Sequence, residues 1–163
     1  MKAFFAAAVA LALAGCAGYK PILDGYTGPV ATVADSGFAE DGTKGQLFVL
    51  AEIDGNKIPD SFGASREASY GQGFRLNVRF LERQVPARPM KVRLRGSHST
   101  GAPIRAMSSQ AAGTFFSVEG VVDFAPKANG KYVVKGELKK DGSSIWIEDA
   151  ETNQVVTEKV TKN

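Results

Sequence analysis

The feature that most restricts the fold is an alternation of apolar and polar residues with a period of two. In Phe74–Phe80 the apolar residues occupy the even positions, and Met90–Arg95 repeats the pattern. Such alternation predicts strands with one face on a core and the other in water. No segment carries the apolar stripe that a helix of useful length would need, and only Ala64–Tyr70 and Ala106–Ala112 are candidates for a helical turn.

Further strands are predicted by runs rich in β-branched and aromatic residues, which clusters of Gly, Pro, Asn and Asp separate. These runs cover residues 46–53, 114–124, 132–138, 145–147 and 155–160. Gly120 is a candidate β-bulge. About eight short, mostly antiparallel strands predict an all-β fold, a single Ig-like β-sandwich over residues 32–163, with a partly open barrel as the alternative.

The amino terminus has the layout of an export signal. Lys2 precedes the apolar stretch Ala3–Leu13, which is shorter than the roughly 20 residues that span a bilayer but suits a signal peptide. The tetrapeptide Leu13-Ala14-Gly15-Cys16 resembles the lipobox of bacterial lipoproteins. The resemblance implies cleavage before Cys16 and lipidation of its thiol. The alternatives are an ordinary signal peptide cut at a nearby Ala-x-Ala-like site, or a buried helix with an incidental cysteine.

The segments around the lipobox give a domain plan and a location. We expect a lipoprotein signal peptide over residues 1–15, and a lipidated cysteine with a flexible Gly- and Pro-rich tether over residues 16–31. Cys16 is the only cysteine, so the chain has no internal disulfide, and acylation would remove a free thiol from an oxidising compartment. Ala17 is not acidic; by resemblance to enterobacterial sorting rules, this implies the outer membrane, with the domain facing the periplasm.

Two wider resemblances concern the whole chain and the predicted domain. The chain is similar to small uncharacterised proteobacterial lipoproteins. The segments Ala51–Gly55, Val85–Ala87 and Val92–His98 weakly resemble the PEGA-type Ig-like β modules associated with surface layers. That resemblance supports the fold class alone.

The supply of catalytic residues argues against an enzyme. His98 is the only histidine, and a serine triad would have to join it to a carboxylate and to one of Ser36, Ser97 and Ser99. None of these serines lies in a G-x-S-x-G turn, and Gly96–Gly101 is typical of a flexible loop. We therefore predict no catalytic residue and no cofactor.

Metal binding is also not predicted. A single histidine and an acylated cysteine leave zinc without its usual ligands. The acidic residues Glu148, Asp149 and Glu151 could bind a hard cation, but they lack the spacing of an EF-hand loop, and a solvated turn is the simpler interpretation.

Charge is distributed unevenly along the chain. The formal net charge is +3, but the span from Arg66 to Arg105 holds nine basic residues against two acidic ones, a net +7. If the two alternating strands are neighbours, their outward faces form one basic patch. This patch is a candidate anion-binding site, because the guanidinium fork suits phosphate and carboxylate oxygens. Its residues are Arg75, Arg79, Lys91, Arg93 and Arg95. The alternative is a solvated face whose charges pair with acidic residues of adjacent strands.

Three functional hypotheses follow. The first is a membrane-anchored periplasmic lipoprotein with a non-enzymatic role in binding, scaffolding or envelope assembly. The second is a module that binds an anionic ligand (a lipid headgroup, lipopolysaccharide or an acidic protein) through the basic face. The third is a hydrolase or inhibitor on an Ig-like frame. The expected partners are the membrane, through the lipid, and an envelope protein or anionic envelope component; export argues against nucleic acid.

Overall fold

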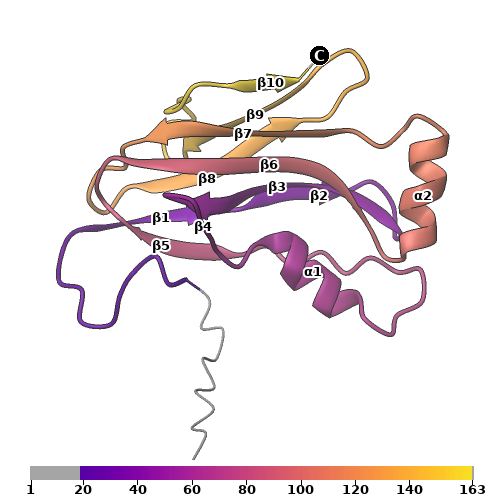
Figure 1. Ribbon diagram of the computed structural model, residues 1–163, viewed down its shortest axis with the longest axis horizontal. Coiled ribbons are helices and arrows are strands. Elements are labelled where there is room, and N and C mark those ends of the chain that lie inside the picture. The colour runs from indigo at the N-terminus through magenta and orange to yellow at the C-terminus, as the bar shows by residue number, and fades with distance from the viewer. Residues whose placement is uncertain (1–18, 163) are drawn as a thin grey trace, which may run out of the picture.

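The computed structural model describes residues 19–162 as two packed β-sheets with two short helices (Figure 1). The strands are β1 (Val30–Ala34), β2 (Ser36–Ala39), β3 (Lys44–Ile53), β4 (Asn56–Lys57), β5 (Glu82–Pro86), β6 (Met90–Thr100), β7 (Ser117–Phe124), β8 (Lys131–Glu137), β9 (Ser143–Asp149) and β10 (Val160–Lys162). The helices are α1 (Ser61–Ser69) and α2 (Pro103–Ala111).

The strands form one sheet in the order β10-β9-β8-β1-β5 and a second in the order β2-β3-β6-β7, with the short β4 paired to β3. Within the described residues, β1 and β8 are parallel and every other pair is antiparallel. The predicted all-β sandwich of mostly antiparallel strands is therefore confirmed, with ten strands in place of about eight.

The main core fills the space between the two sheets. Val33 and Val134 enter it from one sheet and Phe48 and Leu94 from the other, all of them buried. Strand β3 is buried on its second face as well, because Leu47 and Val49 pack against Phe62 of α1 in a separate cluster. A strand covered on both faces has a continuous apolar sequence, which explains why β3 does not alternate.

The prediction of a strand over residues 74–80 is wrong. These residues form an irregular extended segment beside α1, and its backbone N–H groups donate to serine hydroxyls of that helix instead of to a neighbouring strand. The pairs are Asn77 with Ser69, Arg79 with Ser65, and Leu81 with Ser61, each at 2.9 Å. The alternating pattern thus belongs to an extended chain that uses a helix as its hydrogen-bonding partner.

Helix α1 covers most of one predicted helical turn. Its N-cap is Asp60, whose side chain accepts a hydrogen bond from the N–H of Gly63 at 2.9 Å. The buried face carries three serines and only one large apolar residue, Phe62. The apolar stripe is therefore absent. Helix α2 covers most of the other predicted turn, and none of its residues is buried.

Other local predictions differ in detail. The last strand covers only Val160–Lys162, and the predicted bulge at Gly120 is not present, because the β6–β7 register runs through it without a shift. The register shifts instead in β3, between Leu50 and Glu52. The loop predicted around His98 is part of the long strand β6.

The described chain begins beside the sandwich. Tyr19 packs against the main core, and residues 19–22 share a small apolar pocket with Ile58, Pro59 and Leu81. Residues 19–22, which belong to the predicted tether of residues 16–31, thus lie against the domain, whereas Cys16 lies outside the described residues. No helix in residues 19–162 is both long enough and apolar enough to cross a bilayer.

Candidate functional site

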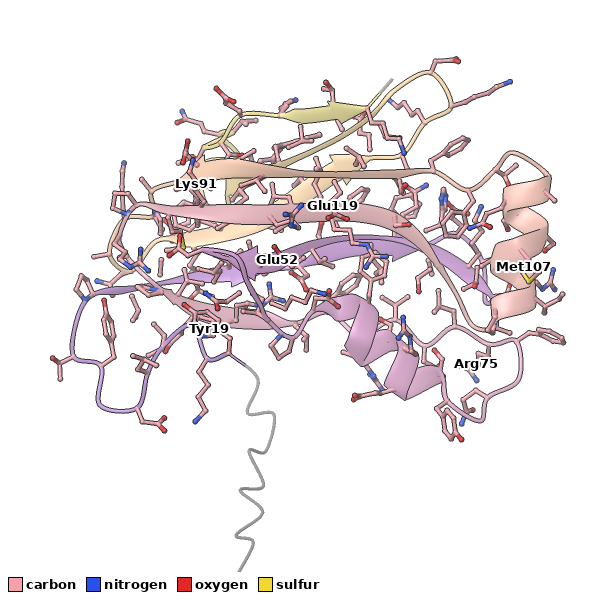
Figure 2. All side chains as sticks on the ribbon, viewed as in Figure 1. Tyr19, Glu52, Arg75, Lys91, Met107 and Glu119 are labelled. Carbon is pink, nitrogen blue, oxygen red and sulfur yellow. The ribbon has the colours of Figure 1, made fainter. Side chains whose placement is uncertain are left out.

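The five predicted anion-binding residues occupy two separate regions of the structure. Arg75 and Arg79 lie in the extended segment beside α1, whereas Lys91, Arg93 and Arg95 lie on β6. Figure 2 places Arg75 near the lower end of α1 and Lys91 at the opposite end of the sheet. The premise of two neighbouring strand faces is therefore wrong, while anion binding by individual residues stays a prediction.

Two of the five basic residues are neutralised within the sheet. Lys91 pairs with Asp123 of β7 at 2.9 Å. Arg93 donates to Glu52 of β3 at 2.7 Å and to Glu119 of β7 at 3.2 Å. These carboxylates accept hydrogen bonds from the cations, and the bonds that Lys91 donates to Asp123 and Arg93 donates to Glu52 are the main causes that raise the pKa of Lys91 and of Arg93. This part of the face matches the alternative in which charges pair across strands.

Arg95 behaves differently from its neighbours on β6. Its register partner is Glu119, but that carboxylate bonds to Arg93, and the guanidinium of Arg95 instead lies 4.6 Å above the ring of Phe62 on α1. Stacking on an aromatic face leaves the edges of a guanidinium free to donate hydrogen bonds. Arg95 is thus turned toward α1.

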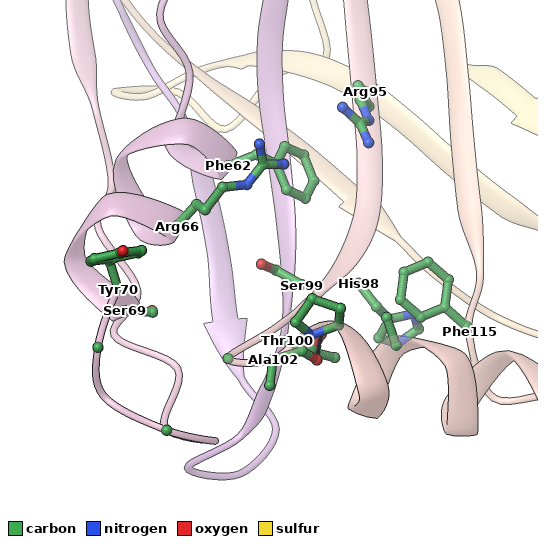
Figure 3. A pocket seen from close by; sticks show the side chains of 15 residues that line it. Phe62, Arg66, Ser69, Tyr70, Arg95, His98, Ser99, Thr100, Ala102 and Phe115 are labelled. Atoms are coloured by element: carbon green, nitrogen blue, oxygen red, sulfur yellow. Dashed lines mark hydrogen bonds between the residues drawn. The ribbon is translucent and has the colours of Figure 1, made fainter.

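Arg95 and α1 border a cleft of about 550 Å³ between the two helices. Its walls come from α1, the turn after it, the end of β6, the start of α2 and Phe115. Figure 3 shows Arg66 of α1 and Arg95 reaching toward the ring of Phe62 from two sides. Neither guanidinium makes a hydrogen bond or an ion pair within residues 19–162, and no acidic residue is among the described residues that line the cleft.

Aromatic and hydroxyl groups complete the cleft. Tyr70, which is 89% exposed, stands at one side, and Phe115 closes the other (Figure 3). Ser99 adds a hydroxyl to the lining, and Gly71 and Gly73 line the cleft without side chains of their own. Two cations that lack an acidic partner in the described part of the chain, beside aromatic faces and a hydroxyl, form a surface suited to an anionic group on a larger ligand.

His98 lies at the buried edge of this cleft. The N–H of Phe116 donates to Nδ1 at 3.0 Å, which assigns the proton to Nε2, and Nε2 donates to Glu40 at 2.8 Å. Burial lowers the pKa of His98, against the opposing charge of Glu40, and its side chain is only 3% exposed. Within the described residues, neither ring nitrogen bonds to a serine hydroxyl, so the geometry of a serine triad is not formed there.

Glu40 is held ionised by the same cluster. Burial raises the pKa of Glu40, but the hydrogen bond from Gln46, the charge that His98 carries when protonated, and the hydrogen bond and charge of Lys44 outweigh it, so the net pKa is lowered. The carboxylate thus accepts from a neutral imidazole and from Lys44, at 3.2 Å. This cluster connects β6 to the chain after β2 behind the cleft.

The acidic residues considered for a cation have structural partners. Asp149 accepts from the N–H groups of Glu151 and Thr152, each at 2.9 Å, and Glu148 accepts from the indole of Trp146 at 2.7 Å. No group of three or more His, Cys, Asp or Glu side chains within residues 19–162 is arranged to hold a metal ion.

Sequence reasoning included Arg95 but did not single out Arg66 or Phe62. Arg66 belongs to the basic span, yet its place beside Arg95 depends on α1 folding over β3 and β6.

Comparison of the chain with protein families, with curated proteins and with solved structures finds no match.

Proposed function

We propose that this protein is a lipid-anchored lipoprotein of the cell envelope with a non-enzymatic binding role, and that it binds an anionic envelope component in the cleft between α1 and α2. The observation that carries the binding role is the pair Arg66 and Arg95, two cations that line one cleft and lack an acidic partner within residues 19–162. Cationic side chains gathered without counter-charges repel one another, so an anion entering the cleft is favoured.

The anchor is supported by the lipobox. Tyr19 is three residues from Cys16, and three extended residues span roughly 10 Å. A lipid on Cys16 would therefore hold the sandwich close to the membrane, at the periplasmic side of the outer membrane. A Cys16→Ser variant should lose the acyl mass measured by mass spectrometry and leave the membrane fraction. Retention of the acyl mass in that variant would reject Cys16 as the attachment site.

Ligand binding is tested with two purified probes: lipopolysaccharide, which offers phosphates, and soluble peptidoglycan fragments, which offer carboxylates. The double variant Arg66→Gln/Arg95→Gln should weaken binding of the recognised probe by roughly tenfold or more, because hydrogen bonds to charged groups contribute about 1.5–3 kcal/mol each. Raising the salt concentration should weaken wild-type binding in the same direction.

The matched control is Lys91→Gln/Arg93→Gln, which removes the same charge from the paired part of the sheet face. This control should bind almost as well as wild type. If the control loses more binding than the cleft variant, the anion binds on the strand face and the cleft assignment is wrong.

A further inference from the structure

Large apolar side chains are exposed together at the end of the molecule where the two helices lie. Tyr70 and Phe74 belong to the turn after α1, and Ile104 and Met107 lie on α2. Phe74, Ile104 and Met107 are 55%, 58% and 63% exposed. Figure 2 labels Met107 on α2, at the end of the molecule where this helix lies. We call these four residues the helix-end patch.

The two segments that carry the patch lie side by side. The backbone of Phe74 and Arg75 lies so close to Gly101, just before α2, that a Cβ on Gly101 would be 2.3 Å from the carbonyl oxygen of Phe74. The guanidinium of Arg105 on α2 stacks over the ring of Phe74 at 5.6 Å. Ile104 and Met107 are three residues apart, so they share a helix face. The exposed apolar residues of the turn after α1 and those of α2 are therefore carried by two neighbouring segments.

The patch is flanked by cations. Arg75 and Arg105 make no side-chain hydrogen bond or ion pair within residues 19–162, and both are exposed. Asp41 is near enough to Arg105 for the guanidinium to contribute to its lowered pKa, but its carboxylate is bound by Thr43 and Lys44. The charge beside the apolar groups is therefore positive.

We propose that the helix-end patch inserts into the surface of a bilayer that carries anionic headgroups. Exposed Ile, Met and Phe side chains enter the boundary between headgroups and acyl chains, while arginines beside them bind lipid phosphates. The positive charge on its rim complements such a surface. Helix α2 suits this role because it stands at the edge of the sandwich with none of its residues buried.

The surface is distinct from the anion site in the cleft, although Tyr70 borders both. It would also give the protein a second membrane contact besides the proposed lipid on Cys16. The inference that two contacts orient the sandwich rests on that proposed anchor. Tyr19, the first described residue, lies on the same side of the sheets as α1 (Figure 2). A lipid near Tyr19 and a patch at the helix end would contact one membrane at two points, which would fix the orientation of the sandwich.

The test places a fluorescent indole in the patch. The full chain carrying Trp146→Phe and Met107→Trp is isolated from expressing cells and reconstituted in vesicles of phosphatidylethanolamine and phosphatidylglycerol that contain brominated lipid. The matched control carries Trp146→Phe and Val155→Trp, the latter at an exposed apolar position on the chain that follows β9. Insertion predicts a blue-shifted emission for the Met107→Trp protein and quenching severalfold stronger than that of the Val155→Trp control.

Further variants and a second vesicle composition test the contributions of the arginines and of the apolar side chains. Adding Arg75→Gln/Arg105→Gln to the Met107→Trp protein, or using vesicles of phosphatidylcholine alone, should reduce the quenching, and adding Phe74→Ser/Ile104→Ser should reduce it further. If Trp146→Phe impairs folding, the same measurement is made with Trp146 retained and its signal subtracted.

Two outcomes would overturn the proposal. One is quenching of the Met107→Trp protein no stronger than that of the Val155→Trp control. The other is a blue shift that grows with protein concentration without vesicles, which would assign the patch to a second copy of the chain. Arg66→Gln/Arg95→Gln should leave the quenching intact, so failure of the cleft function and failure of membrane insertion are distinguishable.

Discussion

At the scale of single residues, Asp35 connects three parts of the fold. Its carboxylate lies just after β1 and accepts two hydrogen bonds from Arg83 of β5, at 2.7 and 2.6 Å. It also accepts from the N–H of Leu50 in the second sheet at 3.0 Å and from the hydroxyl of Ser61 in α1 at 2.7 Å. The side chain of Asp35 is fully buried and that of Arg83 is 11% exposed. One carboxylate thus joins both sheets to the helix that borders the cleft.

Removing the cation from this pair should be costly. Arg83→Met leaves a buried charge without its partner, and the expected loss of unfolding free energy is about 3–5 kcal/mol. The measurement is urea denaturation at neutral pH, with Lys91→Met, in the exposed ion pair with Asp123, as the control at about 1 kcal/mol or less. A loss from Arg83→Met as small as that of the control would contradict the role given to the pair.

The lowered pKa of His98 predicts the direction in which the stability of the protein changes with pH. Its pKa in the folded protein lies below the ordinary 6.5, so the unfolded chain takes up a proton that the folded protein resists. Stability should therefore be complete above pH 6.5 and fall as the pH decreases toward the folded pKa. The lowered pKa of Glu40 acts in a separate window below its ordinary 4.5.

The check is the urea midpoint of unfolding between about pH 7.5 and pH 5, the range in which histidine titrates. His98 is the only histidine, so a His98→Gln variant should have a flatter profile in this range. An unchanged slope in the variant would show that another group governs the dependence.

At the scale of elements, α1 and the following extended segment form a unit that neither could form alone. Three serines at intervals of four residues place their hydroxyls on one helix face, and each accepts from the segment's backbone. Buried N–H groups must find acceptors, and here side chains replace the neighbouring strand. The second face of β3 is covered as a result, and Arg66 is carried to the cleft.

Ser65→Ala should destabilise the protein by about 1–3 kcal/mol, because the N–H of Arg79 loses its acceptor. Ser108→Ala on the exposed helix α2 is the matched control, and its effect should be within about 0.5 kcal/mol. Both are measured by urea denaturation. Equal stability of the two variants would exclude a structural role for the serine ladder.

At the scale of the whole molecule, the two sheets approach closely at Gly136 of β8. A Cβ at this position would lie 2.4 Å from the ring of Phe48 in the other sheet and 2.7 Å from the carbonyl oxygen of Ser144. The space belongs to a buried aromatic ring and to backbone, so neither neighbour can move away freely.

Gly136→Ala should therefore lower the unfolding free energy by about 1–3 kcal/mol through overpacking. The matched variant is Gly42→Ala, where a Cβ would meet no atom within 4 Å and the change should be small. Thermal unfolding of the two variants checks this. If Gly136→Ala is as stable as Gly42→Ala, the sheets are not held at the distance described.

The predictions that succeeded depend on local sequence. The alternation of Met90–Arg95 and the apolar run at 46–53 predicted β6 and β3, because a strand in a sandwich must place alternate residues on its core face or bury both faces. The same rule failed at Phe74–Phe80, where an extended chain alternates in the same way but bonds to helix α1.

The sequence by itself determined the fold class and the residues able to carry charge. It also set the expectation of a lipid on Cys16, which lies outside the described residues. Only the tertiary structure decided which cations lack an acidic partner within residues 19–162: Lys91 and Arg93 pair with acids across strands, whereas Arg66 and Arg95 line one cleft, where Arg95 lies over the ring of Phe62. The physical reason is that alternation fixes the face of a strand on which a side chain lies, while its partner there depends on contacts between segments far apart in the chain.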